Sequence, residues 1–162
     1  MPTHAEKRVL AFTPKQLFDL VADVDRYPEF LPWCVGARVW KREGNVLHAN
    51  LIIGYKVFRE RFTSRVTLTP PKRDASGLER GGRVDVVYLD GPFRYLNNHW
   101  IFEPRGKDDC LIDFFIDFEF HSRFLQMAMH GVFNEAVQYM VRAFEKRAQN
   151  LYGANAVVAD PA

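Results

Sequence analysis

The side chains that most often carry out chemistry are spread thinly along this 162-residue chain. Its five histidines show no metal-binding spacing such as the His-Glu-x-x-His pattern of zinc enzymes. Its two cysteines, Cys34 and Cys110, form no Cys-x-x-Cys pair, so we expect two buried thiols in a reduced compartment. Phosphate-cradling glycine motifs and the Gly-x-Ser-x-Gly motif of hydrolases are absent from the sequence. The sequence therefore predicts no metal site, no catalytic cofactor and no enzyme activity.

Three carboxylates, Asp113, Asp117 and Glu119, resemble the paired acids of acid–base catalysts. The alternation of the segment Cys110 to Phe120 instead places them on the polar face of a strand. We expect them to meet basic side chains across the sheet. The candidates are Arg59, Arg61, Arg65, Lys7 and Arg8.

Glu60 differs from these acids because its register points it inward, with Phe62 and Val66. A lone buried carboxylate is costly, so Glu60 should be paired, face a ligand, or lie at a rim. A bulged strand that leaves Glu60 in solvent is the alternative.

Two segments are unusually rich in aromatic side chains. Tyr27 to Cys34 contains two prolines, which stiffen a loop that presents Phe30, Leu31 and Trp33. Asp90 to Phe102 begins with a turn and continues as a strand. Loops normally avoid such apolar content, so these residues either fill a core or line an opening.

The periodicity of the chain predicts the elements that position these residues. The pattern predicts a strand at Glu6–Phe12, then a helix capped by Thr13 that ends near Asp25 or Arg26. One long helix is expected over Arg123–Tyr152, with Leu151 on its apolar stripe. Further strands are expected at about Val35–Lys41, Val46–Ile53, Phe58–Thr69, Arg83–Tyr88, Asn97–Glu103 and Cys110–Phe120.

These elements predict an α+β fold, in which a curved antiparallel sheet of about seven strands wraps around the long C-terminal helix. We expect a single domain over residues 1–153, a structureless connection from Pro70 to Gly82, and a disordered tail at 154–162. The net charge of +2 is too small to favour DNA binding, and no apolar run spans a bilayer. Without a recognisable targeting signal, a cytoplasmic protein is expected.

The sequence resembles the coenzyme-Q-binding START-domain family of the polyketide-cyclase-like, helix-grip superfamily. The resemblance rests on D-V-x-x-Y-P-x-F-L-P-W-C from Asp23 to Cys34 and on G-P-F-x-x-L-x-x-x-W-x-F from Gly91 to Phe102. Phe118-Glu119-Phe120 and the closing stretch from Ala143 to Gly153 also match, so the resemblance covers nearly the whole chain.

The resemblance implies a bacterial protein that binds ubiquinone or a related polyprenyl lipid between sheet and helix. Such a protein would act as a carrier or chaperone for respiration or quinone biosynthesis, with transient peripheral contact at the inner membrane. The alternative is a regulator that binds a ribosomal subunit, since bacterial members are described as ribosome-association toxins.

The inward register and the two aromatic segments give the candidate ligand-binding residues: Leu31, Trp33, Glu60, Phe62, Phe93, Leu96, Asn98, Trp100, Phe118, Met129, Phe133, Val137 and Met140. Of these, Asn98 and, in its protonated form, Glu60 are the candidates for polar contact with the head group.

Overall fold

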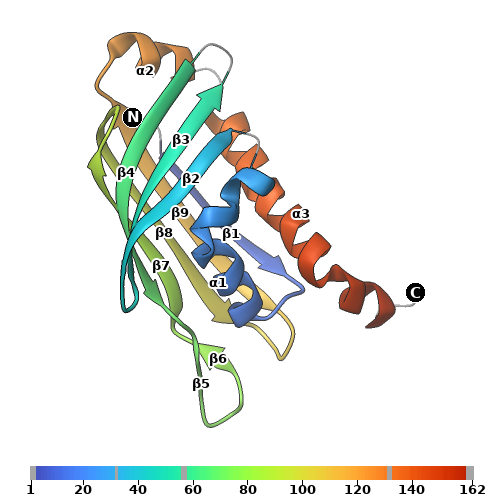
Figure 1. Ribbon diagram of the computed structural model, residues 1–162. Helices are drawn as coiled ribbons and strands as arrows, with labels where there is room; N and C mark the ends of the chain where they lie inside the picture. The colour runs from blue at the N-terminus through green and yellow to red at the C-terminus, as the bar shows by residue number, and fades with distance from the viewer. Residues whose placement is uncertain (1–2, 32, 56–57, 131–132, 160–162) are drawn as a thin grey trace.

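The computed structural model describes residues 3–31, 33–55, 58–130 and 133–159, without the side chains of residues 55, 58, 129, 130, 133, 134 and 154–159 (Figure 1). Its helical elements are α1 (Pro14–Ala22), the 3-10 helix η1 (Val24–Glu29), α2 (Arg123–His130) and α3 (Phe133–Ala159). Its strands are β1 (Thr3–Leu10), β2 (Cys34–Glu43), β3 (Val46–Tyr55), β4 (Phe58–Thr69), β5 (Lys72–Arg73), β6 (Glu79–Arg80), β7 (Gly82–Asp90), β8 (Phe93–Pro104) and β9 (Cys110–Phe120).

Seven of the strands form one antiparallel sheet in the order β1-β9-β8-β7-β4-β3-β2. The sheet curves around α3, which lies across its concave side, and α1 lies near one end of α3 (Figure 1). This confirms the predicted helix-grip architecture. Strands β1 and β2 are neighbours in sequence but lie at opposite edges, because α1 and η1 carry the chain across.

Local signals explain the start of α1. The Thr13 hydroxyl accepts a hydrogen bond from the Gln16 amide at 3.1 Å, and the Gln16 side chain accepts one from the Thr13 amide at 2.9 Å. Pro14 occupies the first helical turn, where no amide proton is needed. The predicted capping box is confirmed. The helix ends earlier than expected, at Ala22, and the residues from Val24 continue as a 3-10 helix.

The C-terminal region differs from the single predicted helix. It contains two helices, and α2 lies at the end of the sheet while α3 crosses it (Figure 1). Gly131, a weak helix former, lies in the sequence between them. Leu151 is 50% exposed, whereas Val141 and Ala148 are buried, because seven residues fall about 20° short of two helical turns and the buried stripe drifts around α3. Beyond Tyr152, the expected helix end, α3 continues to Ala159, where alanines favour helix.

Two other expectations are corrected. The connection predicted to be structureless contains the short β5–β6 hairpin, held by Asp74, which accepts hydrogen bonds from Ser76 and Leu78. The acids of β9 do not meet the arginines of β4, because β8 and β7 lie between these strands. Asp113 lies opposite Lys7, one of the other expected partners, so that part of the prediction agrees with the structure, and Asp117 accepts a hydrogen bond from Thr3 at 2.9 Å.

Candidate functional site: an apolar cavity between sheet and helix

The inward faces of the strands carry a large group of aromatic residues. On β9 the alternation places Phe114, Phe118 and Phe120 inward, as predicted, and each is at most 7% exposed. The β8 register sets Phe93 opposite Phe120 and Leu96 opposite Phe118. Large rings from neighbouring strands therefore form one continuous apolar wall.

This wall and α3 enclose a cavity of about 510 Å³. A volume of this size is within the range of small-molecule sites, and far larger than the voids of a packed core. Its wall is mainly aliphatic and aromatic, with Phe62, Phe93 and Phe118 from the sheet and Val137 and Met140 from α3. Such a wall suits an apolar ligand and offers few polar contacts.

The loop before β2 is fixed against α3. Tyr27 and Phe30 make edge contacts with Phe144, with ring centroids 5.4 and 5.1 Å apart. The Arg147 guanidinium lies 5.2 Å from the Phe30 ring and donates a 2.7 Å hydrogen bond to Glu29. The apolar loop that the sequence singled out thus becomes one side of the cavity.

The exposed lining residues mark the mouth of the cavity. Glu135 and Tyr139 line it from the first turns of α3, and Tyr139 is 52% exposed. The Trp33 ring packs on Tyr139 with centroids 5.6 Å apart. The mouth therefore opens between the start of α3 and the loop that contains Leu31 and Trp33.

Polar groups in the wall are few. Tyr27 donates its hydroxyl proton to the Val21 carbonyl oxygen, and burial raises the pKa of this phenol above its ordinary value. Cys34 donates to the Gly36 carbonyl oxygen, and burial raises the pKa of its thiol to about 11. Both groups are neutral at physiological pH and already partnered.

Glu60 lines the cavity and is intermediate in exposure, so the strand is not bulged outward there. Its carboxylate makes no hydrogen bond or ion pair within the described part of the chain. Of the two arrangements weighed from the sequence, the inward one is present.

Eleven of the thirteen sequence-predicted site residues lie in the cavity wall: Leu31, Trp33, Glu60, Phe62, Phe93, Leu96, Asn98, Trp100, Phe118, Val137 and Met140. The side chains of Met129 and Phe133 lie outside the described residues. The sequence prediction missed several lining residues. Ser64 is the most notable, because its inward register on β4 was readable from the same alternation.

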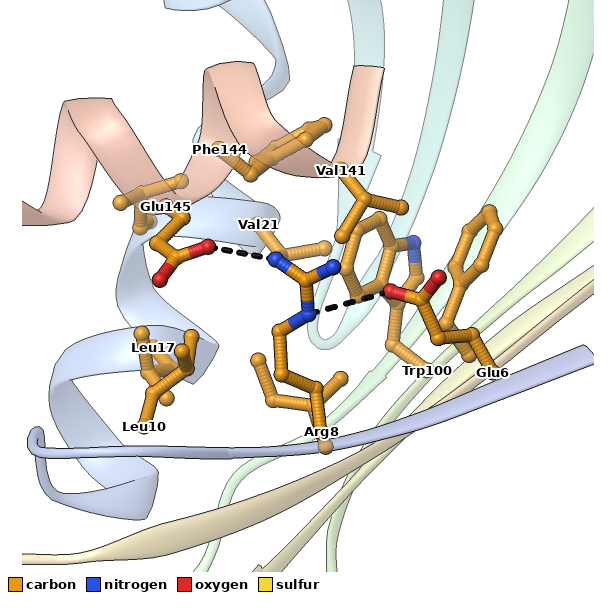
Figure 2. Close-up of a pocket in the computed structure, with 12 residues that line it drawn as sticks. Glu6, Arg8, Leu10, Leu17, Val21, Trp100, Val141, Phe144 and Glu145 are labelled. Carbon is orange, nitrogen blue, oxygen red and sulfur yellow. Dashed lines mark hydrogen bonds and ion pairs between the residues drawn. The ribbon is translucent and has the colours of Figure 1, made fainter. Parts of the chain in front are cut away.

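A second, much smaller cavity of about 20 Å³, room for about one water, lies behind this wall (Figure 2). Arg8 contributes to its lining and forms ion pairs with Glu145 of α3 at 2.6 Å and with Glu6 at 3.2 Å. Trp100 and Phe144 line both cavities and separate them. Arg8 is one of the expected partners of the β9 acids, but in the structure it faces inward and links β1 to α3.

Within the described residues, no group of three or more His, Cys, Asp and Glu side chains is arranged to hold a metal ion. Over the same part of the chain, no helix is both long and apolar enough to cross a bilayer.

The fold and the cavity define a helix-grip protein of the START-like class, in which a curved sheet and a long helix enclose an apolar chamber. Residues 10–145 match the family described as polyketide cyclase / dehydrase and lipid transport, and the chain belongs to this family.

Several known proteins resemble the chain along most of its length. The ribosome association toxin RatA of Vibrio cholerae is 34% identical over 145 residues, covering 90% of this chain and 94% of that protein. The mitochondrial coenzyme Q-binding protein COQ10 homolog B of Xenopus laevis is 35% identical over 154 residues, covering 93% of this chain and 59% of that protein. The solution structure of an 18 kDa protein from Caulobacter crescentus is 39% identical, with a TM-score of 0.70, and the match covers 94% of this chain and 99% of that one.

Proposed function

We propose that the chain binds a polyprenylated quinone such as ubiquinone in the cavity between sheet and α3. In this role it carries the lipid to membrane enzymes of respiration or quinone biosynthesis. The observation that carries the proposal is the cavity of about 510 Å³ with its mainly apolar wall. The similarity to a protein named as coenzyme Q-binding supports the choice of ligand.

The energetics suit a carrier. Burying an apolar tail supplies about 0.8 kcal/mol per methylene relative to water, but almost nothing relative to a bilayer, which is itself an apolar solvent. The protein therefore holds the lipid in water and exchanges it with membranes near equilibrium.

The cavity wall supports binding rather than catalysis. The family description covers cyclases and dehydrases as well as lipid transport. The two lining carboxylates, Glu60 and Glu135, belong to different elements, and Glu135 is exposed at the mouth. The two titratable groups deeper in the wall, Tyr27 and Cys34, are held neutral by burial and are engaged with backbone carbonyls.

The test is lipid analysis of natively purified protein. We expect organic extraction and mass spectrometry to recover quinone at up to one molecule per chain, and the delipidated protein to take up quinone from loaded vesicles. Quinone-free vesicles provide the control. Failure of both extraction and uptake would contradict the proposal.

A second function, binding to a ribosomal subunit, is favoured by the outer face of the sheet. Arg38, Arg59, Arg61 and Arg65 are exposed on β2 and β4, and none forms an ion pair with another described residue. Free guanidinium groups on one face suit RNA phosphates, and one relative is named as a ribosome association toxin.

Co-sedimentation with isolated ribosomal subunits tests this second function. Binding that falls steeply with salt, and falls further in an Arg61→Gln/Arg65→Gln variant, would support it. Arg142→Gln, on the exposed face of α3, is the matched control. Binding that depends on neither salt nor these arginines would exclude the outer face as the site.

A further inference from the structure

Two side chains in the cavity wall carry buried hydrogen-bond donors without a partner. Trp100 is 5% exposed and Ser64 is 2% exposed. Within the described residues, Trp100 makes ring contacts but its indole N–H makes no hydrogen bond, and neither does the Ser64 hydroxyl. An indole nitrogen can only donate. Buried polar groups of this kind almost always have a hydrogen-bond partner, so the lack of an acceptor for these two donors requires an explanation.

Both donors reach open space. In the described part of the chain, the only fully enclosed side-chain polar atoms without a hydrogen-bond partner are Glu6 Oε2, which forms an ion pair with Arg8, and His48 Nδ1. The Trp100 nitrogen and the Ser64 oxygen are therefore accessible from within the fold. Ser64 lines only the large cavity, whereas Trp100 lines both.

Asn98 adds a third donor. Its Nδ2 donates to the Phe115 carbonyl oxygen at 2.8 Å, which fixes the amide orientation because only the NH₂ group can donate there. The second N–H and Oδ1 of Asn98 remain without a partner in the described chain.

These three residues, Ser64, Asn98 and Trp100, form what we call the donor cluster. Asn98 and Trp100 are alternate residues on one face of β8, about 7 Å apart. Ser64 lies on β4, on the other side of β7: it pairs with Tyr88, and Asn98 pairs with Val86. From the strand spacing and this register, the Cα atoms of Ser64 and Asn98 lie about 12 Å apart and those of Ser64 and Trp100 about 16 Å apart, so the three donors are spread along one wall of the chamber.

Within the donor cluster, Trp100 lies away from the mouth. The Trp100 ring contacts Phe144 with centroids 4.9 Å apart. Phe144 follows the exposed mouth residue Glu135 by nine positions, which corresponds to about 14 Å along the axis of α3. Apolar side chains, among them Phe93, Leu96 and Met140, line the rest of the chamber.

Resting on the proposed function, we infer that the quinone enters ring first and that the donor cluster binds its carbonyl and methoxy oxygens. The isoprenoid tail then extends past the apolar side chains to the mouth. A quinone ring offers acceptors and no donors, which complements the three donors, whereas the tail has no group that could satisfy them. Glu60 is left out of the donor cluster, because a carboxyl group donates a hydrogen bond only when it is protonated.

The first test is the indole N–H signal of Trp100 in a proton–nitrogen correlation spectrum, assigned with a Trp100→Phe variant. The probes are a benzoquinone with a decyl tail and decylbenzene, which has the same tail and no oxygen. We expect the quinone to shift the Trp100 N–H signal downfield and decylbenzene to leave it near its free position. Equal shifts with both ligands would overturn the inference.

The second test compares affinities. We expect Trp100→Phe to weaken quinone binding about 3- to 10-fold, the value of one net hydrogen bond, while decylbenzene binding changes less than about twofold. Ser64→Ala should behave in the same way, and Trp40→Phe, exposed on the outer face, should change neither ligand.

The outcomes separate the two proposals. If the wild-type protein binds neither probe, the proposed function fails. If it binds both, and the variants weaken both equally, the indole acts only by packing and the ring-first orientation alone is wrong.

Discussion

At the residue scale, Met140 distinguishes a ligand chamber from a packed core. It lies in mid-helix on the cavity side of α3 and is only partly buried, whereas its neighbour Val141 is 8% exposed and lines the small cavity beside Arg8 (Figure 2). The two adjacent positions therefore offer a matched pair of substitutions.

We expect Met140→Arg to fold with a modestly lowered melting temperature and to lose quinone retention, because the guanidinium can extend into the chamber. Val141→Arg should cost several kcal/mol, since it buries a charge next to the Arg8 cation. Thermal unfolding and lipid extraction measure both effects. An unfolded Met140→Arg protein, together with a Met140→Ala cost of about 2–5 kcal/mol, would show that the space is filled.

The two thiols give a second prediction at this scale. Burial raises the pKa of Cys34 to about 11 and that of Cys110 to about 12, from an ordinary value of 9.0. Both thiols should therefore react slowly with iodoacetamide at pH 8 in the native protein and rapidly in urea.

The same shifts set a pH dependence. Above about pH 9 the unfolded chain releases thiol protons that the folded chain retains, so stability falls as the pH rises toward 11 and 12. The slope of unfolding free energy against pH should be smaller in a Cys34→Ala variant. An unchanged slope would mean that Cys34 is not protected in the folded state.

At the element scale, the junction between β1 and α3 depends on the Arg8–Glu145 ion pair (Figure 2). Both side chains are about a third exposed, so solvent screens the pair. We expect a coupling energy of about 0.5–1 kcal/mol from a double-mutant cycle of Arg8→Met and Glu145→Gln, measured by urea unfolding.

The control is a second cycle on Lys15 and Asp19, an exposed pair within α1 at 2.8 Å, which should couple by about 0.3–0.5 kcal/mol. A coupling at Arg8 and Glu145 no larger than zero would mean that apolar packing alone holds α3 against β1.

The sequence predicted the strands far better than the C-terminal helices. The alternation of apolar and polar residues along a strand can be recognised from a few residues. The predicted bounds of β4 and β9 therefore agree with those in the structure. Helical periodicity continues across Gly131, so it did not reveal that α2 and α3 are separate helices. Strand order was also unpredictable, because the placement of β8 and β7 between β9 and β4 is set by the folded sheet and not by local pattern.

The sequence likewise predicted some features of the candidate site and not others. Alternation identified which face of each strand points inward, so it found Phe62, Phe93 and Phe118. It gave no information on distances across the sheet, so the relation between Ser64 and Asn98 emerged only from the β4–β7–β8 register.

At the scale of the whole molecule, α2 presents an apolar surface beside the chamber. Phe124 and Met127 are 78% and 77% exposed and lie one turn apart on the same helix. Gln126 accepts a hydrogen bond from the Phe120 amide, so α2 is held against the end of β9, whose Phe120 lines the cavity. A membrane is the surface at which a lipid carrier exchanges its ligand.

We expect reversible association with lipid vesicles that falls severalfold in a Phe124→Ser/Met127→Ser variant, because about two large apolar side chains no longer enter the bilayer. Vesicle sedimentation measures the association, and quinone affinity in solution should not change. Val87→Ser/Leu89→Ser, on the exposed outer face of β7, is the matched control. Equal loss in both variants would show that α2 is not the contact surface.

The pairing of β1 with β9 also determines when the protein can fold during its synthesis. Thr3 lies opposite Asp117, so β1 has no partner until more than a hundred further residues have been added. At about 5–20 residues per second, this delay lasts roughly 6 to 23 seconds. The helix that covers the inner face of the sheet is added later still. During translation, the aromatic wall of the future chamber is therefore exposed to water and to chaperones. The large cavity is the last part of the fold to be enclosed.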